Sequence, residues 1–483
     1  MLLNRSRASF RRLLTRQLST GAAKHLDLVC SGCGTRVDGS QQAIFKCPNA
    51  DSQPDVDHVL EPAPLPRDGL AEGVPGEDLS STNPFVRYRG MLYAHRVALA
   101  RGMTDAQYVE MAEGLNAALQ ATGGASFTET PLVYHEPLNT FFKVEVNNVG
   151  QSHKARHLAN AMLYLLAHRN TGDVDLGKRR LAVASCGNAG LAAAEVAAAA
   201  EWPIDVCIPP DADEAVKRRL LDLAPKGVAM LICDRSGQPV ETALGPVQTT
   251  NFADPTLAVM SNLVSDHGSI PFSVQGTECG LAVEGGQTLA WEILASLKRD
   301  HPNVKRLGNL YVQVGGGALG AGLAQGMRRA VEGELDTSGW RAIEASVEAE
   351  PTLLCVQPEG CQPLHRAWSR MLRDEKTPRQ AATARDKYMW PWDNPKSVAH
   401  GILDDETYDW VALCDGMQRT GGGPLSVHDE AIVEAHSYAK ESLGVTTCHT
   451  GAAGLAALML RHQATPPPAG SAPDVVILSG LDR

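Results

Sequence analysis

The sequence contains no uninterrupted apolar run near the roughly 18 residues that would suggest a membrane-spanning helix. It is also short of positive charge: 44 lysines and arginines stand against 55 acidic residues, and the formal net charge is −11. An acidic balance of this kind gives no electrostatic reason to expect binding to nucleic acid. Both absences favour a globular protein that acts on a small molecule, with no membrane and no nucleic acid as partner.

Cysteine is also sparse, with 11 residues scattered through 483. Disulfide scaffolds are typical of short secreted chains, so this pattern favours reduced thiols in a larger fold. At roughly 150 residues per domain, the length allows two or three domains.

Acidic residues are missing altogether from Met1 to Leu26, where arginine, serine and scattered leucine dominate. Arginine-rich, acid-poor composition is typical of an organellar transit peptide. We therefore expect residues 1–25 to be a transit peptide, for the mitochondrion with the plastid as an alternative. A basic tail without a targeting role is the other interpretation.

Residues 26–62 resemble a zinc ribbon that lacks its second cysteine pair. Cys30 and Cys33 form a CxxC knuckle, and Cys47 follows 14 residues later. No fourth cysteine follows nearby, so His58 is the candidate for the missing ligand. The sequence predicts a structural zinc site or, equally, a ribbon that has lost its metal. Residues 63–83, rich in proline, glycine and acidic residues, are predicted to be a linker.

Strands and helices are predicted to alternate along most of the chain beyond residue 84. Apolar runs typical of strands occur at Thr140–Val146, Arg180–Ser185, Ile204–Pro209, Val228–Cys233, Leu310–Val314, Leu353–Gln357 and Val475–Ser479. Helical stretches lie between them, at His157–His168, Leu191–Glu201, Glu214–Leu223, Thr288–Lys298, Gly320–Val331, His428–Ser442 and Ala452–Arg461.

This alternation predicts an α/β fold with two doubly wound parallel-sheet domains. The larger domain is expected at 84–155 and 270–483, and the smaller one at 156–269. Ligands of such folds bind beyond the carboxyl ends of the strands, so the loops at those ends should carry the chemistry.

A lysine stands in the first of these loops. Val149-Gly-Gln-Ser-His-Lys154-Ala-Arg156 follows a strand and enters a helix. The partial positive charge of a helix N-terminus disfavours an ammonium group there. The position suits an amine whose pKa must fall before it attacks an aldehyde.

Three further loops are built from small residues. Ala184-Ser-Cys-Gly-Asn-Ala-Gly190 and Val314-Gly-Gly-Gly-Ala-Leu-Gly-Ala-Gly322 each join a strand to a helix, where backbone N–H groups can bind an anion. Cys448-His-Thr450-Gly enters the last long helix, where a hydroxyl can serve simply as an N-cap. Each loop is weak evidence taken alone.

The order of the four motifs resembles that of pyridoxal phosphate (PLP) enzymes of fold type II, the tryptophan synthase β-like superfamily. The resemblance implies Lys154 as the Schiff-base lysine and Asn188 as a partner of the ring hydroxyl. It implies that the phosphate is bound by Gly315, Gly316, Gly317 and Ala318, and the pyridine nitrogen by Thr450. The substrate carboxylate would be held by Ser185, Cys186, Gly187 and Asn188.

Within the superfamily, the chain most resembles threonine synthases and threonine dehydratases. Arg87-Tyr-Arg89, Thr130-Pro-Leu132 and Glu284-Gly-Gly-Gln-Thr288 are similar to threonine synthase segments, whereas Ala155-Arg156 is closer to the dehydratases. We expect a homodimeric amino-acid lyase acting at the β or γ carbon, threonine synthase-like. The alternatives are an L-serine/L-threonine ammonia-lyase, a cysteine synthase-type enzyme and a non-catalytic PLP-binding protein.

Four other features are predicted to be structural. His153 and Arg156 are expected on the helix surface. Asp404-Asp-Glu406 is expected to form a solvated turn, and Met389-Trp-Pro-Trp392 to pack near a loop.

Overall fold

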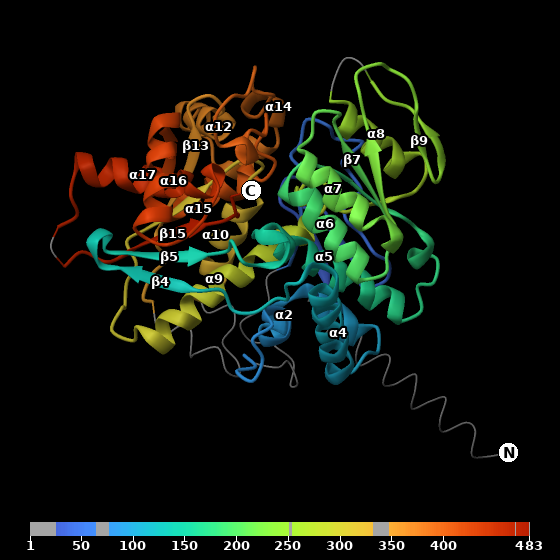
Figure 1. Ribbon diagram of the computed structural model, residues 1–483, viewed down its shortest axis with the longest axis horizontal. Coiled ribbons are helices and arrows are strands. Elements are labelled where there is room, and N and C mark those ends of the chain that lie inside the picture. Colours follow the sequence, from blue (N-terminus) through green and yellow to red (C-terminus); the bar gives the residue numbers. More distant parts are fainter. Residues whose placement is uncertain (1–25, 64–76, 251–253, 332–346, 469, 483) are drawn as a thin grey trace.

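The structure is a computed structural model that describes residues 26–63, 77–250, 254–331, 347–468 and 470–482. The predicted transit peptide and residues 64–76 of the predicted linker lie outside the described residues. Two lobes stand side by side, each built around its own sheet, with helix α5 (Lys154–Asn170) between them (Figure 1). The predicted α/β class with parallel sheets is confirmed.

The larger sheet has six strands in the order β14-β13-β12-β15-β5-β4, and all neighbours are parallel except β4 and β5. Their bounds are β4 Leu132–His135, β5 Thr140–Val144, β12 Asn309–Gln313, β13 Thr352–Pro358, β14 Gly423–Val427 and β15 Asp474–Leu478. The central strands β5 and β15 are buried throughout, as expected for a sheet covered on both faces.

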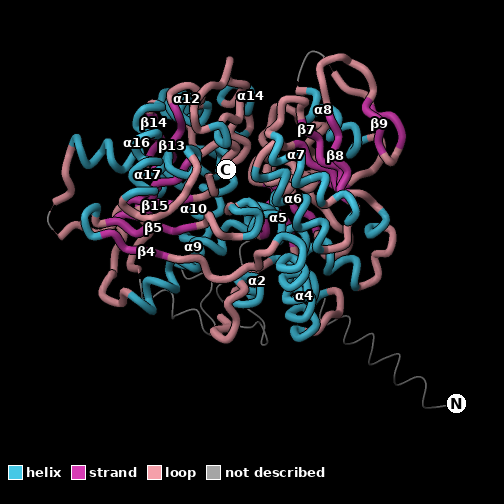
Figure 2. Tube along the Cα trace, in the orientation of Figure 1, coloured by secondary structure: helices cyan, strands magenta, loops and turns pink. Residues whose placement is uncertain are grey.

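Side chains alternate between two cores across this sheet. Phe142, Val476 and Leu478 pack with α16 and α17, whereas Phe141, Val475 and Ile477 pack with α9, α10 and α15. Figure 2 shows helices on both sides of these strands. The helices of this lobe are α9 Gly280–Asp300, α10 Ala318–Val331, α12 Pro363–Arg373, α13 Pro378–Ala382, α14 Arg385–Tyr388, α15 Trp410–Thr420, α16 Asp429–Glu441 and α17 His449–Ala464.

The smaller sheet has four parallel strands in the order β11-β6-β7-β8. These are β6 Leu181–Ala184, β7 Ile204–Ile208, β8 Val228–Ile232 and β11 Ile270–Pro271. β11 lies in the segment that the sequence analysis assigned to the larger domain, yet it pairs with β6. The associated elements are α6 Asn188–Ala199, α7 Glu214–Asp222, α8 Pro255–Ser265 and the hairpin β9 Val240–Thr242 and β10 Gly245–Val247.

The N-terminal part forms a small antiparallel sheet and a helical layer. The sheet has the order β2-β1-β3, with β1 Asp27–Cys30, β2 Arg36–Asp38 and β3 Leu60–Pro62. The helices are α2 Pro84–Arg87, α3 Tyr93–Ala100 and α4 Asp105–Gly123. Thr104 caps α4 and forms a capping box with Gln107. No helix in the described ranges is both long and apolar enough to span a membrane.

Two glycines of α9 allow α5 to approach closely. A Cβ atom on Gly285 would lie 2.3 Å from the carbonyl oxygen of Arg156, and one on Gly286 would lie 2.5 Å from Cε1 of His157. Any larger side chain would therefore push the first turn of α5 outward. This contact gives the Glu284-Gly-Gly signature a structural reason and fixes the position of the helix that begins with Lys154.

Candidate active site

Lys154 is the first residue of α5, at the carboxyl end of the larger sheet. The end of β15 positions it: the N–H of His153 donates to the carbonyl oxygen of Ser479 at 3.1 Å, and Ser152 pairs with Gly480. Lys154 is half-buried and has no hydrogen bond or ion pair to any residue that the structure describes. Desolvation lowers the pKa of its amine, although the carboxylates of Asp404 and Asp409 partly oppose that shift.

The two histidines beside Lys154 are buried and uncharged. Burial first, and then the charge of Lys154, lower the pKa of His157 to about 3 and that of His153 well below its usual value. Nδ1 of His157 contacts the carbonyl oxygen of Ala282 at 2.8 Å. The prediction that His153 lies on the helix surface is wrong, because residues Ser479–Gly480 cover the start of the helix.

The glycine loop follows β12 and leads directly into α10, whose first residue is Ala318. A Cβ on Gly315 would lie 2.2 Å from Oδ2 of Asp404, and Gly317 has a φ of +107°, which favours glycine. The N–H of Gly316 donates to Oδ2 of Asp404 at 2.9 Å. The loop therefore already binds an anionic oxygen through its backbone.

Asp404 is a site residue that the sequence analysis missed. The expected solvated turn at 404–406 is instead half-buried, and burial raises the pKa of Asp404, while the charge of Lys154 lowers it. Residues 389–392 pack against this segment as predicted: the Trp392 N–H donates to the Asp405 carbonyl oxygen at 2.8 Å. Sequence alone could not reveal this, because Asp404 and Gly316 are far apart along the chain.

The predicted residues of the loop between β6 and α6 lie at the carboxyl end of the smaller sheet. Ser185 follows β6, Cys186 is exposed, Gly187 is the N-cap of α6, and Asn188 is its first residue. A Cβ added to Gly480 would lie 3.1 Å from Nδ2 of Asn188 and 3.4 Å from Sγ of Cys448. The Asn188 amide therefore meets the end of β15 beside the start of α5.

Thr450 lies in the first turn of α17, on the other side of Gly480. It is not the N-cap of this helix; that position belongs to Cys448, whose sulfur accepts from the N–H of Gly451. Oγ1 of Thr450 accepts from the N–H of Gly401 at 2.9 Å, three residues before Asp404. The hydroxyl is thus held beside the segment that contacts the glycine loop.

A fully buried ion network lies behind Lys154. Arg156 pairs with Glu145 at 2.8 Å and with Glu292 at 2.7 Å, and Glu292 also pairs with Lys143 at 2.6 Å. Thr130 donates to Glu145 and Glu292. The predicted surface role of Arg156 is therefore wrong: its guanidinium is 0% exposed and ties α5 to α9 and to Glu145, the residue after β5.

The four predicted metal ligands also come together. The ligand atoms of Cys30, Cys33, Cys47 and His58 all lie within 4.8 Å of one another.

The residues around Lys154 fit a phosphorylated pyridine aldehyde. An amine with a lowered pKa and no partner among the described residues suits the aldehyde, and the glycine loop, where a Cβ on Gly315 would clash with Asp404, suits the phosphate. Oγ of Ser152 and Oε1 of Gln313 are buried polar atoms without a hydrogen-bond partner in the described part of the chain, beside the end of β15. Such atoms are expected to gain partners from a polar ligand.

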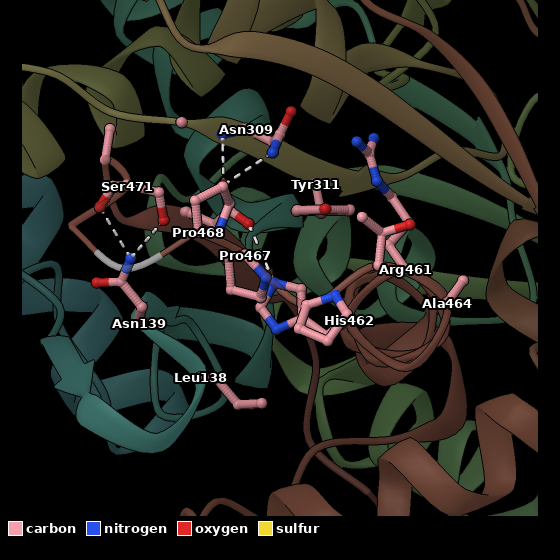
Figure 3. A pocket seen from close by; sticks show the side chains of 15 residues that line it. Leu138, Asn139, Asn309, Tyr311, Arg461, His462, Ala464, Pro467, Pro468 and Ser471 are labelled. Carbon is pink, nitrogen blue, oxygen red and sulfur yellow. Dashed lines mark hydrogen bonds and ion pairs between the residues drawn. The ribbon is translucent and has the colours of Figure 1, made fainter.

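A separate pocket lies at the opposite end of the larger sheet (Figure 3). Asn309 and Asp474, the first residues of β12 and β15, line it together with Tyr311, Arg461 and His462. Ligands of parallel α/β sheets bind at the carboxyl ends of strands, so this pocket is distinct from the Lys154 site.

Solved structures with this fold include several enzymes. Maize serine racemase is 20% identical, with a TM-score of 0.51, over 76% of this chain and 92% of its own. Threonine deaminase isoform 2 of Solanum lycopersicum, in its processed form, is 14% identical, with a TM-score of 0.52, over 79% and 92%. Diaminopropionate ammonia lyase from Escherichia coli is 16% identical, with a TM-score of 0.50, over 77% and 89%.

At these identities the likeness shows the fold alone. No curated protein matches the sequence. The family model described as "Pyridoxal-phosphate dependent enzyme" matches residues 125–480, which is most of the chain and includes all four loops. The expected cofactor is thereby confirmed as pyridoxal 5′-phosphate, and the chain belongs to the family of pyridoxal-phosphate dependent enzymes.

Proposed function

We propose that the protein is an amino-acid lyase that removes a leaving group from the β carbon of its substrate, in the manner of an L-serine or L-threonine ammonia-lyase. The observation that carries this proposal is the amine of Lys154: half-buried, with a lowered pKa and no partner among the described residues. An amine in this state can attack an aldehyde and can also accept a proton from a carbon acid.

Each loop has a role in this proposal. The N–H groups of residues 315–318 hold the phosphate, Asn188 and Thr450 hold the two polar edges of the ring, and residues 185–187 bind the substrate carboxylate. Nζ of Lys154, released when the substrate amine takes its place, receives the proton from the substrate Cα. The electron pair left at Cα then forms a double bond to Cβ, and the leaving group departs from Cβ with its bonding electrons. When bound, PLP supplies the π system that accepts the electron pair left at Cα.

The charges around Tyr408, which lies beside Gly316 of the glycine loop, favour a substrate without a phosphate group of its own. Desolvation, and after it the carboxylates of Asp404, Asp405, Glu406 and Asp254, raise the pKa of Tyr408. These carboxylates come from both lobes, so the space that they share is acidic. A second phosphate there would face like charges, which disfavours phosphohomoserine and with it the threonine synthase-like activity expected from the sequence.

The proposal is tested by incubating the PLP-loaded protein with L-serine, L-threonine, 2,3-diaminopropionate and O-phosphohomoserine. We expect ammonia and a 2-oxo acid from at least one of the first three, and no phosphate from the fourth. Lys154→Ala is the control and should release neither product. Phosphate release with formation of threonine would overturn the proposal in favour of a threonine synthase.

Replacement chemistry is distinguished in the same assay. Added sulfide should not divert the reaction to cysteine; formation of cysteine from an activated serine would favour the cysteine synthase alternative. A non-catalytic PLP-binding protein would bind PLP, but no compound would change the absorbance of the bound PLP and none would be consumed.

A further inference from the structure

The cluster of Cys30, Cys33, Cys47 and His58 has the dimensions of a tetrahedral metal site. Sγ of Cys33 lies 3.6 Å from Sγ of Cys47, and Sγ of Cys30 lies 3.3 Å from Nδ1 of His58. Zinc–sulfur bonds of about 2.3 Å at tetrahedral angles place sulfur ligands about 3.8 Å apart, close to these values. Cys30, Cys47 and His58 are buried and Cys33 is half-buried.

The orientation of His58 supports metal binding independently of the cysteines. Its Nε2 lies 3.0 Å from the carbonyl oxygen of Gln53. A carbonyl oxygen can only accept, so Nε2 carries the proton and Nδ1 presents its lone pair to the three sulfurs. Metal-binding histidines are commonly oriented in this way by a hydrogen bond from the other ring nitrogen.

The turn that carries Cys30 and Cys33 depends on a glycine. A Cβ on Gly32 would lie 1.8 Å from the carbonyl oxygen of Asp57, so only glycine lets the CxxC turn reach the residue next to His58.

We propose that Cys30, Cys33, Cys47 and Nδ1 of His58 bind one Zn²⁺ in a closed structural site, and that this site holds the segment around residues 404–410 against the phosphate loop. Four protein ligands leave no open position on the metal, which is typical of a structural rather than a catalytic zinc.

The link to the phosphate loop runs through Asp57, the residue before His58. The N–H of Asp57 donates to the carbonyl oxygen of Ala382 at 2.8 Å, and its Oδ1 accepts from Nε1 of Trp410 at 3.2 Å. Asp409, the residue before Trp410, donates its N–H to the carbonyl oxygen of Gly316 at 2.9 Å. A shift of the metal site therefore reaches the glycine loop through one side chain and one backbone hydrogen bond.

The first test is the metal content of the full-length protein as purified. We expect about one zinc per chain, in keeping with the four ligands. The Cys47→Ser variant should lose the zinc. The control variant is Cys233→Ser, which should keep the zinc, because Cys233 is a buried cysteine whose thiol donates to a carbonyl oxygen. If Cys47→Ser does not fold, replacing zinc by Co²⁺ in the wild-type protein should give the absorption of a tetrahedral thiolate complex.

The second test measures PLP affinity, without any substrate, before and after chelation of the wild-type protein. We expect the affinity for PLP to fall on the order of tenfold, a usual size for coupling between two sites, and to return when Zn²⁺ is added. Both readouts are independent of catalytic turnover, so a failure here is distinguishable from a failure of the proposed lyase activity.

Two results would overturn the inference. Protein that contains no zinc, takes up neither Zn²⁺ nor Co²⁺, and carries a Cys33–Cys47 disulfide would remove the metal site. Chelated protein that keeps its full PLP affinity would remove the link to the phosphate loop.

Discussion

Lys143 and Lys154 lie close together along the chain and meet opposite environments. Lys143 is fully buried, donates to Glu292 at 2.6 Å and to the carbonyl oxygen of Thr130 at 2.7 Å. Lys154 is half-buried at the start of α5, without a hydrogen-bonded partner in the described ranges. Burial lowers the pKa of both amines, but only Lys143 has a carboxylate in direct contact to oppose it.

The comparison shows that burial alone does not make a lysine reactive. A buried ammonium with a hydrogen-bonded carboxylate is held in its charged form, and its lone pair is not available. Removing the direct partner while keeping the desolvation leaves an amine that loses its proton easily. The ion network around Arg156 then serves to fix the helix on which that amine stands.

The largest effect is expected from exchanging the reactive lysine. Lys154→Ala should lower turnover on the order of a thousandfold or more and abolish the absorbance band of lysine-bound PLP. Its melting temperature should stay the same or rise, because a desolvated amine is removed. Lys143→Met is the matched control: it should keep the absorbance band and lose thermal stability. The opposite pattern would reverse the two roles.

The next largest effect concerns the buried ion network. Among the described residues, Glu292→Gln leaves Lys143 and Arg156 with one carboxylate, Glu145, and should lower the free energy of unfolding by about 3–5 kcal/mol. Adding Lys143→Met restores charge balance, so the double variant should recover part of the loss. Chemical denaturation of the three proteins measures this, and equal losses in single and double variants would argue against coupled charges.

A smaller effect is expected from pH. The lowered pKa of Lys154 means that its amine becomes neutral at a lower pH than an ordinary lysine, whose pKa is 10.5. The rate of PLP capture should therefore rise with pH through a midpoint below 10.5, as followed by stopped-flow absorbance. N-acetyl-lysine methylamide provides the reference curve, and coincident midpoints would contradict the assigned desolvation.

The smallest effect is expected at Asp404, whose carboxylate accepts a hydrogen bond from the Gly316 N–H and lies near Lys154. Asp404→Asn removes one negative charge near the phosphate loop, which should strengthen PLP binding by about 1 kcal/mol, or about fivefold. It should also move the midpoint of PLP capture to lower pH, because the charge that favours protonated Lys154 is lost. Below the raised pKa of Asp404, variant and wild type should converge. Weaker PLP binding would indicate that Asp404 instead supports the cofactor.

Much of the fold could be predicted because the strands of both sheets are short apolar runs. All seven predicted strands exist, with ends within about two residues of the expected ones. Some strands at the sheet edges were missed: β14 contains Gly423 and Pro424 and is only partly buried, and β11 has two residues. Such strands depend on their neighbours in the sheet rather than on their own composition.

The candidate site was predictable where a loop follows a strand and invisible where residues meet across the fold. The four loops follow the sequence pattern, although their individual roles stay predictions. The burial of Arg156 could not be read from periodicity, because residues 155–168 of α5 are buried on every side and show no polar face. Asp404 resembled a turn because three adjacent acidic residues usually face water.

The close contact between α9 and α5 has a further consequence. Gly285 and Gly286 lie in α9, and the absence of two methyl groups there sets the position of the first turn of α5, which carries Lys154. The packing of α9 against α5 thus helps to set the position of the reactive nitrogen. Variants designed to change substrate specificity should keep Gly285 and Gly286, because larger residues there would displace the amine of Lys154.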